Sequence, residues 1–337
     1  MTSTADVSLD VFDQLSKGDA APAWLTDLVV QAWGFTAHEV EVTLITVSEN
    51  ATFLVRVDGE PYAVTRVARP GYMAGTDAFE SEVAWVAALS ADGVVPVPQA
   101  LPTLNGTYTA TTGPWTCVSY KFVPGQILED VSEPVPHYRE IGRMTARLHE
   151  HTMGWQEPRG FTRHSWQIAD MIGPAARWGR WEGAGQDDRL LRRAQEAALA
   201  VIADAPRGPG AWGLIHADLR PSNIMVDDGG LTVIDFDDCG YSWYLYDFAA
   251  ALSFIEHVPE APEMASEWVE GYSEIRPLTR GDLETGCALS MIRRLQMFGW
   301  TTTHRSDALP PELWDAQGSG TTEVAERYLR SATWLLE

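Results

Sequence analysis

The sequence has 337 residues, 45% of them hydrophobic, which is enough for about two domains with a sizeable core. Its formal net charge of −23 argues against a nucleic-acid backbone or an anionic membrane as a partner and is compatible with a cationic substrate. Three scattered cysteines predict free thiols in a reducing cytoplasm, and there is neither a signal-peptide pattern nor an apolar stretch near the ~20 residues of a membrane span.

The first part of the chain predicts a small antiparallel sheet with helices. Apolar residues at helical spacing between residues 8 and 33 are interrupted by Gly18 and Pro22, which predicts two helices. Residues 77–91 carry a further amphipathic helical pattern. The β-type runs, which are short and bounded by turn residues, cover residues 40–47, 52–57, 62–67, 100–101, 108–112 and 115–122. The first three runs predict an antiparallel meander.

The rest of the chain has a mainly helical pattern. The predicted helices cover residues 135–151, 187–204, 263–274, 280–303 and 321–336, and residues 306–320 are predicted as a loop. The tryptophan-rich segment 152–186 favours core packing, with a wall for a cationic or sugar-like substrate as the alternative. The adjacent Arg293 and Arg294 favour a solvated helix face; if buried, they would need carboxylate partners, and they could reach the substrate or acidic loop residues.

A stretch about two thirds of the way along the chain combines short strands with oxygen-bearing side chains. Residues 224–226 and 231–234 are β-type runs separated by an Asp-Asp-Gly-Gly turn signal, which predicts a hairpin. Asp218 and Asn223 then lie on the loop that enters the first strand, and Asp235 follows the second strand. We therefore expect these three side chains to converge at one site.

That arrangement suits phosphoryl transfer, which needs positioned groups and charge neutralisation more than covalent chemistry. The spacing from His216 through Asp218 to Asn223 equals that of the protein-kinase catalytic loop, which is followed by a metal-binding Asp. Asp218 would accept the proton of the attacking hydroxyl, whereas Asn223 and Asp235 would ligate Mg²⁺. Arg220 stands where protein kinases carry a Lys and would steady the transferred phosphoryl group. The alternative is a hairpin whose aspartates only cap turns.

Several neighbouring polar residues have expected structural roles. His216 is expected to hold the loop by hydrogen bonds, and Asp247 to bond loop groups near it. His149, in the last turn of a predicted helix, is expected to be structural rather than catalytic. Asp237 and Asp238 would assist a second metal or the loop, and at least one of the two is expected to be structural.

The motif resembles that of the aminoglycoside phosphotransferase and choline kinase families, in which H-x-D-x-x-x-x-N is followed by I-D-F and then by Tyr-Asp ahead of an apolar helix. Residues 233–236 and 245–247 match these two later parts. The chain is most similar to the branch with type II homoserine kinase, hydroxylysine kinase and a bacterial stress-response kinase. The resemblance covers most of the chain and implies an α+β, two-lobed protein-kinase-like fold. Residues 1–122 would form the nucleotide-binding lobe, with its small sheet, and residues 123–337 the larger, mainly helical catalytic and substrate-binding lobe.

The resemblance also implies a phosphate site in the first lobe. Arg66 stands on the third strand, where the family has a Lys or Arg that pairs with the α- and β-phosphates. Glu82 is the expected ion-pair partner of this cation, with Glu80 as the alternative. A Gly-rich loop is absent from the first turn, which Ser48 and Asn50 occupy instead.

A segment from residue 117 to residue 125 resembles the hinge between the lobes, where backbone groups would bind the adenine ring. Tyr120 and Phe122 lie in this segment, and the alternative is an ordinary edge strand. A hinge that binds the base through its backbone does not distinguish ATP from GTP.

The resemblance implies an Mg²⁺-dependent kinase that moves the γ-phosphoryl group of ATP or GTP to a hydroxyl of a small molecule. An amine-bearing acceptor is favoured: an amino alcohol, a hydroxy amino acid or an aminoglycoside. The alternatives are a stress-response-type protein Ser/Thr kinase, a nucleotide-binding pseudokinase and a metal-dependent hydrolase. Asp247 follows Asp235 by only twelve positions, which leaves no room for a long activation segment. A pure nucleotide binder would not need Asp218 as a base.

Overall fold

The structure, a computed structural model, describes residues 11–12, 14–36, 38–68, 70–71, 75–184 and 188–337. The chain divides into two compact units. Unit 1 consists of Met1–Pro124 and Glu157–Arg163, and unit 2 consists of Gly125–Gln156 and His164–Glu337. No helix of the described part of the chain is long and apolar enough to cross a membrane.

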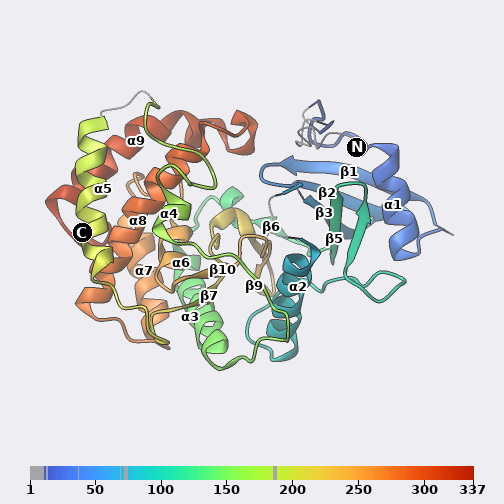
Figure 1. The fold of residues 1–337 in the computed structure, drawn as a ribbon, viewed down its shortest axis with the longest axis horizontal. Helices are drawn as coiled ribbons and strands as arrows, with labels where there is room; N and C mark the ends of the chain where they lie inside the picture. The colour runs from blue at the N-terminus through green and yellow to red at the C-terminus, as the bar shows by residue number, and fades with distance from the viewer. Residues whose placement is uncertain (1–10, 13, 37, 69, 72–74, 185–187) are drawn as a thin grey trace. The chain divides into compact units, whose positions relative to one another are not determined.

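Unit 1 contains an antiparallel sheet of five strands in the order β1-β2-β3-β5-β4 (Figure 1). Its strands are β1 (Val40–Val47), β2 (Ala51–Val57), β3 (Glu60–Ala68), β4 (Thr109–Thr112) and β5 (Trp115–Lys121). In β2, buried Phe53 and Val55 alternate with less buried neighbours, so one face of the strand points into a core. The predicted meander is confirmed.

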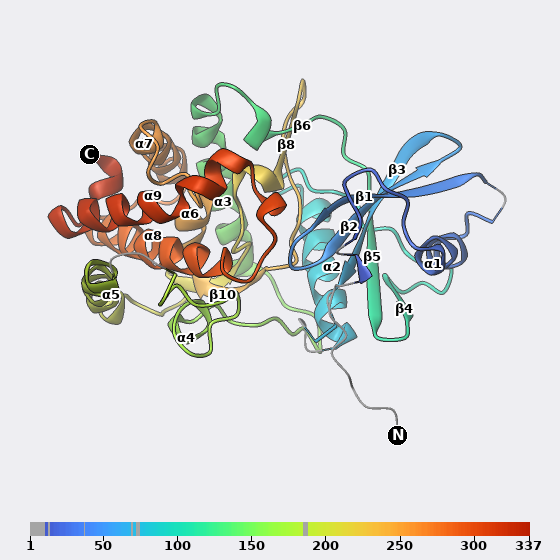
Figure 2. The same cartoon turned by 90° about the horizontal axis from the view of Figure 1, so that it is seen from above.

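Two helices accompany this sheet and belong to separate apolar clusters (Figure 2). Helix α1 (Ala23–Trp33) buries Leu25 and Val29 in the cluster that contains Phe53. Helix α2 (Thr76–Ala91) buries Phe79 and Val83 in the cluster that contains Val118. Both helices lie where the apolar periodicity predicts them.

The first predicted helix, in the segment before Gly18, is wrong where the segment is described. Residues 14–19 form turns, and most of the residues before them lie outside the described part of the chain. The backbone instead pairs with β1, because Gly18 donates to the carbonyl of Leu44 at 2.8 Å and Ala21 donates to that of Val42 at 2.8 Å. The predicted strand at residues 100–101 is reduced to an isolated bridge between Ala100 and Tyr120.

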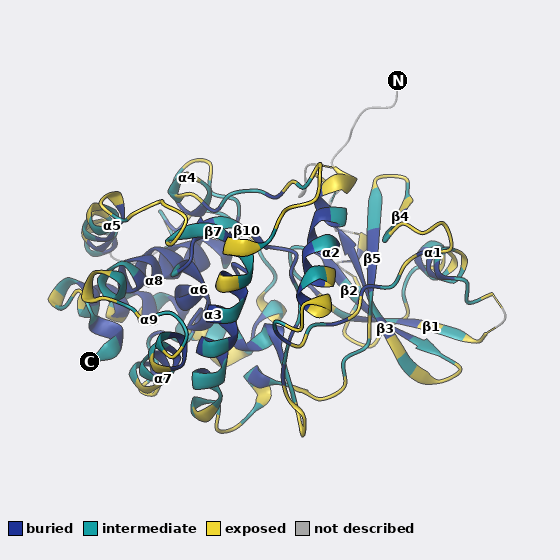
Figure 3. Ribbon diagram, turned by 90° about the horizontal axis from the view of Figure 1, so that it is seen from below, coloured by how far each residue is buried: buried dark blue, intermediate teal, exposed yellow. Residues whose placement is uncertain are grey.

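Unit 2 is mainly helical. Its helices are α3 (Tyr138–Gly154), α4 (Ile168–Met171), α5 (Asp188–Ala203), α6 (Tyr246–Ala251), α7 (Ala261–Ser273), α8 (Arg280–Trp300) and α9 (Pro311–Arg330). Helix α8 packs against α5, α6 and α9. Every residue from Gly286 to Trp300 is buried, polar ones included (Figure 3). A helix that is enclosed on all sides has no solvent face, so the solvated interpretation of Arg293 and Arg294 is wrong.

Tryptophans of the segment before α5 also belong to the interior of unit 2. The exposed fractions of Trp166, Trp178 and Trp181 are 0%, 4% and 1%. Trp166 lies 4.7 Å from Trp178 between ring centroids, as in an aromatic core. This burial agrees with the packing interpretation rather than with a wall for a substrate.

Helices α3 and α7 cross with their backbones in contact. A Cβ atom at Gly271 would overlap the carbonyl oxygen of Arg139, and one at Gly142 would overlap that of Trp268. Ion pairs flank the crossing, with Arg139 2.6 Å from Glu270. Glycine is therefore required at these two helical positions by the close approach of the neighbouring helix.

Helix α9 corrects the prediction of a loop at residues 306–320. The helix begins at Pro311, contains Gly320 and ends at Arg330, so the predicted final helix at 321–336 starts too late. Gly320 lies inside the helix, and a Cβ atom there would come within 2.7 Å of the guanidinium of Arg294. The glycine lets α9 approach α8 closely.

Two small sheets in unit 2 carry the loops of interest. Strand β7 (Trp212–Ile215) pairs with β10 (Gly240–Trp243), and the sequence analysis did not predict this pair. The predicted hairpin is confirmed as β8 (Ile224–Asp227) and β9 (Gly230–Val233), and β8 also pairs with β6 (Gln126–Ile127). The segment between β7 and β8 contains the H-x-D-x-x-x-x-N motif.

Candidate active site

The loop between β7 and β8, residues 216–223, is closed by its own asparagine. The side-chain amide of Asn223 donates to the backbone carbonyl of Asp218 and to its carboxylate oxygen Oδ2, each at 2.8 Å. The backbone amide of Ile234 donates to the carbonyl of Asn223 at 3.0 Å. The structure therefore brings the Asp218 and Asn223 side chains together and places Asp235 directly after the residue that bonds to Asn223.

Two non-glycine residues of this region have left-handed backbone conformations. The φ angles are 68° at Ala217 and 59° at Asp235, values that L-residues rarely adopt. Such strain persists when surrounding contacts fix the backbone, and it is common at functional sites.

Asp247, at the start of α6, supplies contacts that fix the loop. Its fully buried carboxylate accepts the backbone amides of His216 at 3.2 Å and of Ala217 at 2.7 Å. The expectation that Asp247 bonds loop groups near His216 is confirmed. A carboxylate that accepts two amides holds a strained turn more firmly than solvent could.

Both histidines of the region are structural, as expected. The ring of His216 donates through Nε2 to the carbonyl of Ile234 at 3.1 Å and accepts the amide of Asp218 through Nδ1 at 3.3 Å. His149 lies 3.1 Å from the Asp247 carboxylate and 2.8 Å from the hydroxyl of Tyr272. Burial lowers the pKa of His149, against the opposing effect of Asp247.

Arg293, from α8, contacts the loop, and its partners could not be predicted from the sequence. Its guanidinium is fully buried and donates through Nη2 to the Asp218 carboxylate oxygen Oδ1 and through Nη1 to the carbonyl of Ala217. It also donates to Tyr246 Oη at 2.8 Å and to Ser253 Oγ at 2.9 Å. In the sequence, Arg293 stands out only as a charged residue in an apolar stretch, and this pattern does not indicate which residues it contacts.

Arg220 points to a carboxylate outside the loop. Its guanidinium lies 3.2 Å from Glu129 and 4.9 Å from the ring centroid of Phe254. Phe254 itself has a φ of 72°. The guanidinium of Arg220, which was predicted to contact the transferred phosphoryl group, thus lies between a carboxylate and an aromatic ring.

Asp237 and Asp238 are buried, with exposed fractions of 9% and 4%. The backbone carbonyl of Asp238 accepts the indole N–H of Trp166 at 2.7 Å. This contact ties the segment after Asp235 to the aromatic core of unit 2.

In unit 1, Glu82 of α2 pairs with Arg66 of β3. Arg66 Nη2 lies 2.6 Å from the Glu82 carboxylate, and Tyr120 donates its hydroxyl to the same carboxylate at 2.7 Å. Arg163, which the sequence analysis did not select, lies 3.9 Å away. The alternative partner Glu80 instead accepts the hydroxyl of Thr109 at 2.9 Å. Glu82 is therefore the partner of Arg66 in the structure.

The charge of Glu82 depends on these cations. Its carboxylate is fully buried, and burial alone would raise its pKa. The Coulombic effect of Arg66 and Arg163 and the hydrogen bonds of Arg66 and Tyr120 outweigh burial, so the pKa of Glu82 lies below its ordinary value. Glu82 is consequently ionised at neutral pH.

The remaining predicted nucleotide contacts lie at two other places in unit 1. Ser48 and Asn50 form the β1–β2 turn, in which the Ser48 amide donates to the Asn50 carbonyl at 2.9 Å. The amide of Phe122 donates to the carbonyl of Tyr62 at 2.9 Å. Strand β5 lies between β3 and β4, so the alternative of an edge strand at residues 117–122 is wrong.

The donor set near the loop fits a hard cation. No group of three or more His, Cys, Asp or Glu side chains is placed to hold a metal in the parts of the chain that the structure describes. The amide nitrogen of Asn223 donates to Asp218, so its side-chain oxygen is the atom of Asn223 that could serve as a ligand, and Asp235 would add a carboxylate. Oxygen-only ligands, supplemented by phosphates and water, suit Mg²⁺ rather than zinc.

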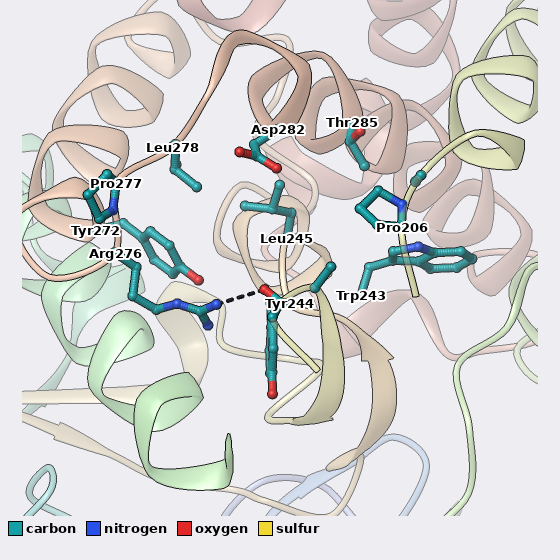
Figure 4. A pocket seen from close by; sticks show the side chains of 13 residues that line it. Pro206, Trp243, Tyr244, Leu245, Tyr272, Arg276, Pro277, Leu278, Asp282 and Thr285 are labelled. Carbon is teal, nitrogen blue, oxygen red and sulfur yellow. Dashed lines mark hydrogen bonds between the residues drawn. The ribbon is translucent and has the colours of Figure 1, made fainter. Parts of the chain in front are cut away.

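A separate cavity of about 80 Å³ in unit 2 lies beside Arg276 (Figure 4). Arg276 stacks 4.6 Å from the ring centroid of Tyr244 and donates to the carbonyl of Gly210 at 2.8 Å. The other lining residues include Tyr272 and Asp282. None of residues 216–223 lines this cavity, whereas Leu245 does.

Comparison with known proteins identifies relatives over most of the chain. Residues 41–282 match the family described as "Phosphotransferase enzyme family". Amicoumacin kinase of Bacillus subtilis (strain 168) is 24% identical over 259 residues, which cover 72% of this chain and 73% of the relative. Homoserine kinase of Gluconacetobacter diazotrophicus is 28% identical over 279 residues, which cover 76% and 79%.

Solved structures match over nearly the whole length. A microcompartment-associated aminopropanol kinase is 36% identical with a TM-score of 0.83, and the match covers 94% of this chain and all of that one. Spectinomycin phosphotransferase in complex with ADP and spectinomycin is 12% identical with a TM-score of 0.65, covering 91% and 98%, and shares the fold. The predicted α+β kinase-like fold is confirmed.

Proposed function

This chain belongs to the phosphotransferase enzyme family, and we propose that it transfers the γ-phosphoryl group of ATP to the hydroxyl group of a small amino alcohol. As a member of this family it is a kinase for hydroxyl groups of small molecules. The observation that carries the choice of acceptor is the 36% identity to an aminopropanol kinase over 94% of the chain. The net charge of −23 supports a cationic acceptor.

We assign the role of base to Asp218. Its Oδ1 is held by Arg293 and its Oδ2 by Asn223, so the carboxylate is fixed in orientation while its side chain stays 19% exposed. A fixed carboxylate can orient the acceptor hydroxyl and accept its proton as the oxygen attacks phosphorus. Because phosphoryl transfer has a loose transition state, orientation is the main contribution expected of this residue.

Asn223 and Asp235 are the proposed Mg²⁺ ligands. When bound, the ion would neutralise negative charge on the phosphates. The side chain of Asn223 serves both functions, because its nitrogen orients Asp218 and its oxygen is left for the cation. Arg220, held by Glu129, is proposed to add positive charge near the transferred group.

Unit 1 is proposed to bind the nucleotide, as the predicted lobe of residues 1–122, and residues 123–337 to supply the base and the acceptor site. Arg66, fixed by Glu82, is the cation proposed for the α- and β-phosphates. Arg163 stabilises the same carboxylate and is proposed to keep it ionised. Ser48, Asn50, Tyr120 and Phe122 remain proposed contacts of the nucleotide.

The relatives named above are small-molecule kinases, which favours a small-molecule acceptor over a protein substrate. Their names also span an amino alcohol, an amino acid and antibiotics, so the acceptor test has to separate these classes. The identity to the aminopropanol kinase exceeds that to the homoserine kinase, at 36% against 28%, which supports the proposal of an amino alcohol over an amino acid.

The test is nucleotide consumption in Mg²⁺ buffer with ATP or GTP and four acceptors: aminopropanol, ethanolamine, homoserine and spectinomycin. We expect ATP consumption with aminopropanol and formation of its phosphate ester, detected by mass spectrometry. Turnover of homoserine or spectinomycin at a higher kcat/KM than aminopropanol would overturn the choice of acceptor. The Asp218→Asn variant serves as the control for contaminating phosphatases and kinases.

A further inference from the structure

Two adjacent arginines on α8 are both fully buried but reach different partners. Arg293 contacts the loop at Asp218 and Ala217, whereas Arg294 lies 2.7 Å from the carboxylate of Glu256 and donates to Thr321 at 2.8 Å. Successive residues of a helix point about 100° apart, so one faces the loop and the other faces α9. Both residues are fully buried and positively charged, but they bond to different partners.

Arg293 is fixed on every side. Its guanidinium lies 5.0 Å from the ring centroid of Trp178 and 5.4 Å from that of Tyr246. Tyr246 is held in turn, because it donates its hydroxyl to Gln296 at 2.5 Å. A guanidinium with planar stacking and directed hydrogen bonds on each nitrogen has little freedom to move.

The bonds of Arg293 and Asn223 together define the orientation of the Asp218 carboxylate. Arg293 donates to Oδ1 and Asn223 donates to Oδ2 at 2.8 Å. Rotation of the carboxylate about its Cβ–Cγ bond would therefore break one of these hydrogen bonds or both. Arg293 also bonds to the carbonyl of Ala217, the residue with a φ of 68° next to Asp218. One side chain thus fixes the carboxylate and the strained backbone that carries it.

Stability alone does not account for a guanidinium at this place. Burying a charge costs solvation free energy, and an apolar residue of similar volume often replaces a buried ion pair with no loss of stability. Asp218 is also the less buried partner, at 19% side-chain exposure against 0% for Arg293. Arg293 is therefore a deeply buried cation whose partner, the Asp218 carboxylate, is partly exposed.

We propose that Arg293 is a positioning residue for phosphoryl transfer, which sets the direction of the Asp218 carboxylate toward the acceptor hydroxyl. The proposal rests on the role of base assigned to Asp218 above. It predicts a loss in kcat, because misplacing a catalytic group by about 1 Å costs on the order of 10²-fold in rate. The KM values for ATP and the acceptor should stay nearly unchanged, since Arg293 is buried beneath the loop.

The experiment compares Arg293→Met and Arg293→Lys with the matched control Arg294→Met, using ATP and aminopropanol. We expect Arg293→Met to lower kcat about 10²-fold and Arg293→Lys to recover part of that loss, because Lys keeps the charge without the planar fork. Arg294→Met should lower the melting temperature and leave kcat near the wild-type value. Equal kcat in the two Met variants, at comparable melting temperature, would overturn the proposal.

A double variant separates this inference from the assignment of the base. If Asp218 is the base, Asp218→Asn removes turnover, and adding Arg293→Met to it should cause little further loss, because no base remains to be oriented. Near wild-type turnover in Asp218→Asn would instead refute the role of Asp218 itself. If the wild type turns over another acceptor of the panel, the same variants are compared on that acceptor.

Discussion

Neighbouring side chains stabilise the ionised form of the Glu82 carboxylate. It is fully buried, 2.6 Å from Arg66, and it also accepts a hydrogen bond from Tyr120. Removing one partner of a buried ion pair is strongly destabilising, because the remaining charge stays buried without a compensating partner. The position of Arg66 therefore depends on Glu82.

We predict that Glu82→Gln lowers the free energy of unfolding by about 3–5 kcal/mol, the range for breaking a buried pair. Arg66 would also lose its fixed position, so the KM for ATP should rise. Chemical denaturation and steady-state kinetics measure the two effects. Glu80→Gln is the matched control, since Glu80 accepts the hydrogen bonds of Tyr108 and Thr109 through one oxygen, which the side-chain carbonyl of Gln can replace. An equal loss of stability in both variants would contradict the prediction.

The same region shows what residue patterns can predict. The resemblance to the family implies Arg66 on a strand and Glu82 on the helix after it as an ion pair, and the structure pairs them. Arg163 lies 81 positions beyond Glu82 in the sequence, and nothing in its surroundings marks it as a partner. Arg293 is likewise 75 positions from Asp218. Contacts of this kind depend on tertiary packing, which local periodicity does not encode.

At the scale of elements, close helix crossings depend on single glycines. Gly271 of α7 faces the carbonyl of Arg139 on α3 so closely that a side chain has no room. The overlap is with backbone, which cannot move aside as the end of a flexible side chain can. The crossing therefore tolerates no Cβ atom at this position without displacement of a helix.

We predict that Gly271→Ala lowers the free energy of unfolding by at least about 1–3 kcal/mol through overpacking, although alanine is the better helix former. The control is Gly281→Ala in the first turn of α8, where the nearest atom to a Cβ would be 3.8 Å away. That variant should be neutral or more stable by about 0.4–1 kcal/mol. Urea denaturation of both variants measures the difference, and a stabilised Gly271→Ala would contradict the described crossing.

Elements whose signals are local were predicted well, and those that depend on burial were not. The β8–β9 hairpin has its turn residues between two β-type runs, so sequence alone places it. Strands β7 and β10 are separated in the sequence by the loop and the β8–β9 hairpin, so no local turn signal indicates that they pair. Residues 311–320 belong to α9, and Gly320 is needed there for packing against Arg294; in sequence such a glycine looks the same as one needed for a turn.

At the scale of the whole molecule, two neutral histidines, one buried and one half-buried, make stability depend on pH. Burial lowers the pKa of His149, and burial together with Arg294 lowers the pKa of His257 to about 4. In the unfolded chain, both groups bind protons near pH 6.5. Between these values the unfolded state binds more protons than the folded state, so acid favours unfolding.

We predict that stability is complete above about pH 6.5 and falls as the pH decreases toward 4. Melting temperatures measured from pH 8 to pH 5 test this direction. His257→Asn should reduce the slope of melting temperature against pH, whatever its effect on the absolute value. A wild-type melting temperature that rises on acidification through this range would contradict the prediction.

The contacts of Asp247 connect the loop to helices α3 and α7. His149 on α3 and Tyr272 on α7 meet at 2.8 Å, and His149 in turn bonds to the carboxylate that holds the amides of His216 and Ala217. Tyr272 directly follows Gly271, at the crossing of those two helices. A genetic screen for inactive but well-expressed proteins should therefore recover substitutions at this crossing, at a distance from the reacting groups.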